Sequence, residues 1–216
     1  MTSQSANFDA ILYFPWVRFV KKSLAIPHFY VKNIGKIDPK KLKECGFKGL
    51  IFDKDNTLTA PGVNKLHSAI RNSFEDYKSV FGDNIIIMSN SAGTKDDKNY
   101  ENAELLGRDL GITVLLHNQK KPSGINAALD YFSCNPRELV MFGDRIFTDI
   151  VFGNRYGMLT AYTTPLTGKG DNIKIRGYEL ALIEKLIRSG KTAPNHPMYK
   201  PDICLENLLA LASITS

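Results

Sequence analysis

The sequence predicts an α/β protein built on a doubly wound parallel sheet, and two observations support this prediction. Short apolar runs alternate along the chain with stretches that have helical periodicity. Most of these runs end abruptly at a cluster of polar residues. In sheets of this kind the functional site lies beyond the carboxyl ends of the strands, which is where those clusters would fall.

Length and composition narrow the class of protein. The 216 residues suffice for one substantial domain, and 43% hydrophobic with 23% charged residues is typical of a folded globular chain. Three cysteines without a CxxC pair argue against a disulfide framework or a zinc site, and they suit a reducing compartment. The formal net charge of +6 favours polyanionic partners: nucleic acid, an anionic membrane or a phosphorylated substrate.

The N-terminal residues 1–44 differ from the rest and are predicted to form an arm ahead of a domain at residues 45–216. No acidic residue occurs between Asp9 and Asp38, where basic residues are interleaved with large apolar ones. Pro15 and Pro27 interrupt this stretch, and we expect no transmembrane helix because no run of 18 apolar residues exists. The basic residues of the stretch are Arg18, Lys21, Lys22, Lys32 and Lys36.

Residues 15–26 are predicted to form a short amphipathic helix, with Trp16, Phe19 and Val20 along one side. Cationic residues beside large aromatic ones suit a helix that lies in the headgroup layer of an anionic bilayer. We therefore expect membrane association, with an arm packed on the domain or a targeting segment as alternatives. A secretory signal is poorly matched, and a mitochondrial presequence fits only in part because the first ten residues carry no Arg or Lys.

Five apolar runs are expected to be buried parallel strands, because each is short and ends at polar residues. They cover residues 49–52, 85–88, 112–116, 139–142 and 158–162. A helix is expected between the first two runs, and two more helical patterns occur in the tail. These helices are predicted near residues 67–81, 178–187 and 203–211.

The polar clusters behind the first three strands hold groups that phosphoryl transfer to a carboxylate needs. Asp53 and Asp55 follow the first strand, so that one can attack phosphorus while the other protonates the leaving alkoxide and then activates water. Ser89, with Asn90 beside it, can donate to a phosphate oxygen. Lys121 can place an ammonium group on the phosphate and the nucleophile together.

A hard cation would offset the repulsion between the attacking carboxylate and a phosphate dianion. Asp144 and Asp149 follow the fourth strand and can complete an oxygen-rich Mg²⁺ shell with Asp53. Asp149 either binds the ion or supports a residue that does. Arg145 is the first candidate for binding the rest of the substrate, ahead of Arg155.

Taken singly, these residues have structural interpretations. Asp55 can belong to a turn with a helix cap, Ser89 can be a cap, and Lys120 and Lys121 can be solvated. The sequence does not decide between the two lysines, and His117 is predicted to be structural or to face the substrate. The functional interpretation is favoured because the clusters occur together, each at the end of a successive strand.

Together these segments resemble the motifs of the haloacid dehalogenase (HAD) superfamily. Asp53-Lys54-Asp55-Asn56-Thr57 is similar to the DxDx[TV] first motif, Ser89 to the second, Lys121 to the third, and residues 143–149 to the GDxxxxD fourth. The resemblance implies a HAD-like Rossmannoid fold, an aspartyl-phosphate on Asp53 and Asp55 as general acid and base. It also implies Mg²⁺ held by Asp53, Asp144, Asp149 and the main-chain carbonyl of Asp55.

The spacing of the motifs leaves no room for a cap domain, which many HAD phosphatases insert after the first or second motif. Only 36 positions separate Asp53 from Ser89, and 32 separate Ser89 from Lys121. The expected helices and strands fill both intervals. Members without a cap tend to act on bulky phosphates, which disfavours a small soluble metabolite as the substrate.

The detailed wording of the motifs and the aromatic-basic arm resemble one branch, the mitochondrial phosphatidylglycerophosphate phosphatases of fungi with their bacterial and plastid relatives. This resemblance implies hydrolysis of that lipid to phosphatidylglycerol, on the route to cardiolipin, by a peripheral protein on the matrix face of the inner mitochondrial membrane. The implied partners are an anionic phospholipid membrane and the lipid phosphate, without nucleic acid or a protein partner.

Two alternatives remain open. A phosphatase of polynucleotide ends or of phosphoproteins would share the open site and the basic charge. A non-enzymatic membrane-binding module would show decayed motif residues, whereas all the motif residues named above are present.

Overall fold

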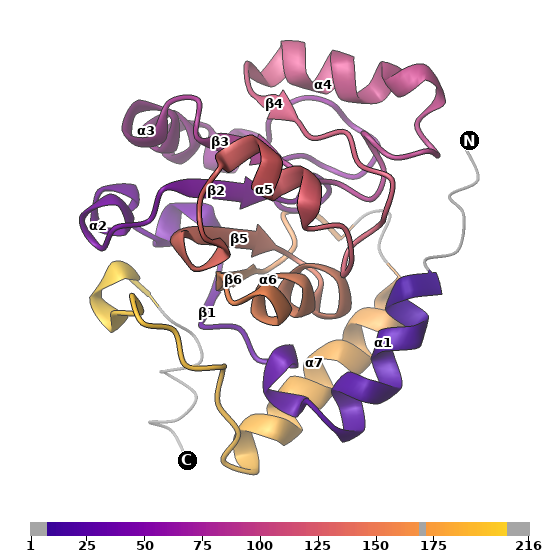
Figure 1. Cartoon of the computed structure of the whole chain (residues 1–216), viewed down its shortest axis with the longest axis vertical. Helices are drawn as coiled ribbons and strands as arrows, with labels where there is room; N and C mark the ends of the chain where they lie inside the picture. Colours follow the sequence, from indigo (N-terminus) through magenta and orange to yellow (C-terminus); the bar gives the residue numbers. More distant parts are fainter. Residues whose placement is uncertain (1–7, 169–171, 207–216) are drawn as a thin grey trace.

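The centre of the molecule is a six-stranded sheet in which all neighbouring strands are parallel (Figure 1). This computed structural model describes residues 8–168 and 172–206, and for residues 8–12 the backbone alone. The strand order is β1-β6-β5-β2-β3-β4. The strands are β1 Phe29–Val31, β2 Gly49–Phe52, β3 Ile85–Ile87, β4 Thr113–Val114, β5 Leu139–Gly143 and β6 Leu159–Thr163. The predicted parallel α/β sheet is confirmed.

Helices cover both faces of this sheet, because successive side chains of a buried strand point to opposite sides. Leu50 and Phe52 of β2 pack in one apolar cluster with side chains of α2, α3 and α4, whereas Ile51 packs in another with α5 and α6. These helices are α2 Pro39–Glu44, α3 Arg71–Phe81, α4 Glu101–Leu110, α5 Asn126–Phe132 and α6 Val151–Tyr156.

A third apolar cluster joins α1, Phe8–Phe19, and α7, Ile173–Arg188, to the π-helical turn Ile146–Ile150. The two helices lie side by side in Figure 1. The ring of Phe14 on α1 lies 4.9 Å from that of Phe147 and 5.5 Å from that of Tyr178 on α7. The N-terminal helix is therefore packed on the segment that carries the fourth motif.

The topological switch point of the sheet lies at β2. The chain proceeds from β2 to β3 on one side, while β5, which comes later, pairs with β2 on the other side. In open α/β sheets such a switch point is where ligands bind. Residues 49–168, all of which the structure describes, contain no inserted domain, in agreement with the predicted absence of a cap.

The five predicted strands are confirmed within two residues at each end, and a sixth was not predicted. Phe29–Val31 forms the edge strand β1 and pairs with Ala161–Thr163. Only three residues long and inside the aromatic-basic stretch, it has no pattern that separates it from a loop. Part of the predicted arm 1–44 thus belongs to the sheet, and the membrane role of the arm stays a prediction.

Helix α1 begins and ends seven residues earlier than the predicted helix at residues 15–26, and Pro15 lies inside it. Proline lacks an N–H, so we expected a break there. The helix continues past it with Val17 fully buried, and residues Lys22–Ala25 form a separate 3₁₀ turn. No helix in the described ranges is long and apolar enough to cross a bilayer.

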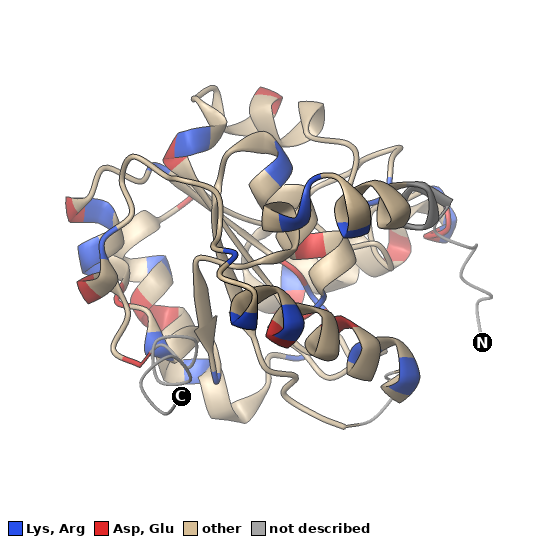
Figure 2. Ribbon diagram, turned by 90° about the horizontal axis from the view of Figure 1, so that it is seen from below, with Lys and Arg blue, Asp and Glu red and all other residues tan. Residues whose placement is uncertain are grey.

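The tail differs from the prediction in extent. Helix α7 is longer than the expected 178–187, and Pro201–Ile203 is a 3₁₀ turn where the pattern 203–211 begins. Residues 207–211 of that pattern lie outside the described residues. Figure 2 shows basic and acidic residues interspersed over the described helices.

Candidate active site

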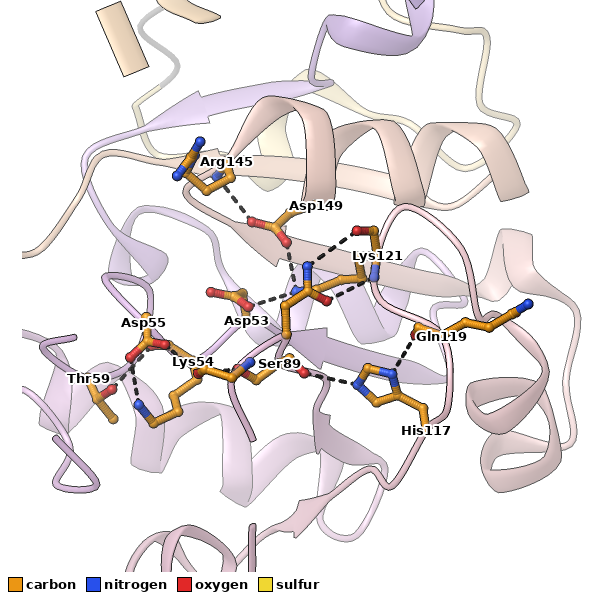
Figure 3. A network of polar contacts seen from close by, with 12 residues as sticks. Asp53, Lys54, Asp55, Thr59, Ser89, His117, Gln119, Lys121, Arg145 and Asp149 are labelled. Atoms are coloured by element: carbon orange, nitrogen blue, oxygen red, sulfur yellow. Dashed lines mark hydrogen bonds and ion pairs between the residues drawn. The ribbon is translucent and has the colours of Figure 1, made fainter. Parts of the chain in front are cut away.

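A buried lysine joins two carboxylates at the carboxyl edge of the sheet (Figure 3). Asp53 is the first residue after β2, and Lys121 lies in the loop after β4. The Lys121 Nζ lies 2.7 Å from Asp53 Oδ1 and 2.7 Å from Asp149 Oδ1. The side chain of Lys121 is 1% exposed, so these ion pairs form away from solvent. Two residues predicted from separate motifs therefore meet at the predicted nucleophile.

The two adjacent lysines in the loop after β4 have different partners. The Lys120 Nζ pairs with Asp96 Oδ2 at 2.6 Å, whereas Lys121 reaches Asp53. The Asn90 side chain fixes this loop, because its Oδ1 accepts from the Lys121 N–H at 2.8 Å and its Nδ2 donates to the Lys121 carbonyl at 3.3 Å. The amide of Asn90, predicted to bind phosphate, thus holds the backbone of Lys121.

Three buried carboxylates form a cluster that suits a hard cation. Oxygen atoms of Asp53, Asp144 and Asp149 all lie within 4.8 Å of one another. Mg²⁺ prefers such oxygen ligands, so the donor set fits the predicted ion. Gly143 makes the cluster possible, because a Cβ at this position would collide with the Asp149 side chain.

The surroundings of these carboxylates shift their pKa values. Burial raises the pKa of Asp53 to about 7; Lys121 opposes this shift, and Asp149 and Asp55 add to it. Burial also raises the pKa of Asp144, with repulsion from Asp53 and Asp149 added and Arg176 opposing. For Lys121, burial lowers the pKa, but attraction to Asp149 and Asp53 outweighs it and the net shift is upward. The site therefore favours a positive charge among repelling carboxylates.

The carboxylate of Asp55 points away from Asp53 (Figure 3). Its Oδ1 lies 2.6 Å from Lys54 Nζ, and its Oδ2 accepts from Ser91 Oγ at 2.6 Å. The Ser91 hydroxyl lies 3.0 Å from that of Ser89. Lys54 and Ser91 lie in the segments of the first and second motifs, but the sequence spacing did not predict that they contact Asp55.

His117 links the loops that follow β3 and β4. Its Nε2 lies 3.0 Å from the Ser89 carbonyl oxygen, and its Nδ1 lies 2.6 Å from that of Gln119. Burial lowers the pKa of this imidazole. The sequence allowed His117 either a structural role or a position facing the substrate, and these main-chain contacts correspond to the structural role.

The two arginines considered for the substrate contact other protein groups. The Arg145 Nε donates to Glu179 Oε2 at 3.0 Å, and Figure 3 shows its guanidinium directed away from Lys121. The Arg155 Nη1 donates to the Pro122 carbonyl at 3.1 Å. Binding of substrate by Arg145 stays a prediction.

A third arginine, which the sequence did not single out, contacts the site. The Arg176 Nη2 lies 2.5 Å from Asp144 Oδ2, and Arg176 comes from α7. Neither Arg176 nor Glu179 belongs to a motif, and the helical pattern of the tail gave no reason to place them at the sheet edge.

The fold and the site together define the class of protein. A parallel α/β sheet without a cap, with the four motif segments on successive strand ends in their expected order, is the arrangement of a HAD-superfamily phosphatase.

The chain belongs to the family described as "Mitochondrial PGP phosphatase", which matches residues 14–167. It is 41% identical over 200 residues to "Phosphatidylglycerophosphate phosphatase 1, chloroplastic/mitochondrial" of Arabidopsis thaliana, covering 90% of this chain and 58% of that protein. It is 33% identical over 189 residues to "Phosphatidylglycerophosphatase GEP4, mitochondrial" of Saccharomyces cerevisiae, covering 85% and 94%. It is 31% identical over 173 residues to "Probable phosphatase YqeG" of Bacillus subtilis, covering 78% and 95%.

The share of these relatives that the chain spans differs. It covers little more than half of the plant protein and nearly all of the yeast and bacterial ones. Helix α7 lies outside the residues that the family matches.

Proposed function

We propose that this protein hydrolyses the terminal phosphate of phosphatidylglycerophosphate, releasing phosphatidylglycerol and inorganic phosphate, with Asp53 as nucleophile. The observation that carries the proposal is the buried Lys121 bridging Asp53 and Asp149, with Asp144 in the same cluster. Membership of the PGP phosphatase family and the names of the plant and yeast relatives support the choice of lipid.

The chemistry divides into two displacements at phosphorus. In the first, an Asp53 oxygen forms a bond to phosphorus, the bond to the lipid oxygen breaks, and Asp55 gives its proton to that oxygen. In the second, Asp55 takes a proton from water, whose oxygen attacks phosphorus and releases phosphate with a free Asp53. For both steps the Asp55 carboxylate has to turn from Lys54 and Ser91 toward Asp53.

The remaining groups of the site balance charge and orient the phosphate. Lys121 brings an ammonium group to Asp53, and the Ser89 hydroxyl can donate to a phosphate oxygen. Asp53, Asp144 and Asp149 would hold Mg²⁺, with the main-chain carbonyl of Asp55 as a further ligand. When bound, the ion would neutralise the charge that builds up on the phosphate oxygens.

The exposed end of α1 supports docking on an anionic bilayer. Phe19 is 68% exposed and Val20 is 65% exposed, and Trp16 on the preceding turn is also exposed. Lys21 and Lys22 follow directly and are exposed too. Apolar side chains beside lysines can enter the interface while the lysines contact lipid phosphates. We place the protein peripherally on the matrix face of the inner mitochondrial membrane; the yeast relative's name supports the mitochondrial part of this placement.

The catalytic proposal is tested by phosphate release from phosphatidylglycerophosphate in anionic vesicles with Mg²⁺. A soluble sugar phosphate and a 5′-phosphorylated oligonucleotide serve as competing substrates. We expect preference for the lipid. Activity should fall about 1000-fold or more in Asp53→Asn, and it should be lost in EDTA. The control Asp130→Asn, an exposed carboxylate on α5, should keep its activity. Turnover of another phosphate in place of the lipid would overturn the substrate, and full activity in Asp53→Asn would overturn the nucleophile.

The membrane proposal is tested separately by flotation with vesicles of anionic and of zwitterionic lipid. Phe19→Ser should weaken binding to anionic vesicles several-fold, because it removes apolar surface that the bilayer would bury. Leu205→Ser is the matched control, since Leu205 is also 68% exposed but lies beyond α7, near the C-terminus. Equal losses in both variants, or none in Phe19→Ser, would contradict docking through α1.

A further inference from the structure

Arg176 of helix α7 makes two contacts with Asp144, the first metal-binding candidate of the fourth motif. The Arg176 Nη2 lies 2.5 Å from Asp144 Oδ2, and its Nη1 donates to the Asp144 carbonyl oxygen at 2.7 Å. The same Nη1 lies 2.9 Å from the Tyr162 hydroxyl of β6. Side chain and main chain of Asp144 are therefore fixed by one guanidinium, which is itself anchored to the sheet.

A second α7 residue, one helical turn later, holds the middle of the same motif. Glu179 is 1% exposed, and its Oε1 accepts from the Phe147 N–H at 3.1 Å. Its Oε2 accepts from Arg145 Nε at 3.0 Å. Because residues three apart lie on the same face of a helix, Arg176 and Glu179 contact the motif from one side.

We propose that Arg176 and Glu179 are positioning residues for the metal site, with Arg176 acting on Asp144 and Glu179 on the backbone after it. The contact of Arg176 occupies one oxygen of the Asp144 carboxylate and leaves the other for an ion. This inference rests on the proposed function, since it assumes that Asp144 binds Mg²⁺. It assigns a role to a helix outside residues 14–167, which the family matches.

The cost of this arrangement argues for a role beyond packing. The Arg176 side chain is 11% exposed and that of Asp144 is 4% exposed, so both charges are largely withdrawn from water. Well-packed apolar residues usually stabilise a fold as well as such a buried ion pair does. Supporting partners that orient a metal ligand contribute about 10–100-fold to metal affinity.

The test measures Mg²⁺ binding without substrate, by the rise in melting temperature and by calorimetry, and in parallel the Mg²⁺ concentration that half-saturates activity. Arg176→Gln should raise the half-saturating Mg²⁺ concentration about 10–100-fold in all three measurements. Arg176→Lys should restore only part of the Mg²⁺ affinity, because an ammonium group keeps the charge but cannot make both contacts with Asp144. Glu179→Gln should lose less Mg²⁺ affinity than Arg176→Gln. Arg188→Gln, which removes an exposed ion pair with Glu184 on the same helix, should match the wild type.

The outcomes separate this inference from the proposed function. If the wild type binds Mg²⁺ and folded Arg176→Gln binds it equally well, the positioning role is overturned while the phosphatase proposal stands. Should Arg176→Gln fail to fold, the same comparison is made with Arg176→Lys. If the wild type itself does not bind Mg²⁺, the metal part of the proposed function fails first and the inference fails with it.

Discussion

The two edges of the sheet handle buried polar groups in opposite ways. At the carboxyl edge, Asp53, Asp144 and Asp149 crowd together around Lys121, and burial raises the pKa values of the first two. Near the amino edge, neutral groups form a closed network. There the His28 Nδ1 lies 2.8 Å from Thr160 Oγ1.

The amino-edge network is completed by Asn154 of α6. The Thr160 hydroxyl donates to Asn154 Oδ1 at 3.0 Å, and the Asn154 Nδ2 donates to the carbonyls of Leu24 and Ile26. Satisfied neutral groups stabilise a buried region without needing a counter-ion. Like charges held together, in contrast, are tolerated only with a compensating cation, and for this reason the proposed catalytic role falls on the carboxyl edge, whereas the amino-edge network stabilises the fold.

The largest expected effect breaks the compensation at the carboxyl edge. Lys121→Met removes the cation between Asp53 and Asp149, leaving both carboxylates buried without it. We expect activity to fall at least about 100-fold and the free energy of unfolding to fall by about 3–5 kcal/mol. Phosphate release and chemical denaturation measure the two effects.

The matched control is the adjacent residue. Lys120→Met removes the ion pair with Asp96, whose side chains are 15% and 24% exposed, so its stability should fall less than that of Lys121→Met. Its activity should stay near the wild-type value. Equal losses in the two variants would contradict the assignment of Lys121 to the site.

A second prediction concerns acid stability of the amino-edge network. Burial lowers the pKa of His28 to about 4, with repulsion from His196 added and the Pro194 carbonyl opposing. The unfolded chain, with the ordinary value near 6.5, then binds more protons between these limits, so stability falls as the pH drops from 6.5 toward 4. The loss from this residue is on the order of 3 kcal/mol.

The measurement is the free energy of unfolding of wild type and His28→Gln at several pH values. The variant should be less stable at neutral pH and should show a shallower decline across that window. An unchanged slope would mean that another group causes the acid sensitivity.

The smallest effect is expected from the exposed charges at the amino edge. Lys48 and Glu138 form an ion pair with a 2.8 Å separation, and the Lys48 side chain is 61% exposed. Lys48→Gln should leave activity unchanged and lower the denaturation midpoint only slightly, with the difference vanishing at high salt. A large loss of activity would show that charge at this edge also reaches the catalytic site.

Local patterns predicted most of the fold and the core of the site. The apolar runs that end at Asp53, Ser89 and Asp144 are visible within a few residues, because a buried parallel strand needs a continuous apolar segment. The contacts of Arg176 and Glu179 could not be read in the same way. They arise from packing of a helix some thirty residues further along the chain, and no spacing within α7 distinguishes a residue that faces a carboxylate from one that faces solvent.

The strand order also constrains the order in which parts of the growing chain can fold. β1 is synthesised before the other five strands of the described sheet, but it pairs with β6, more than a hundred residues later. Strands β2 to β5 can assemble as soon as they emerge, whereas the N-terminal segment has to wait until residue 163 is made. β1 and the helix α1 that precedes it are therefore synthesised well before the strand and the helix α7 that they contact.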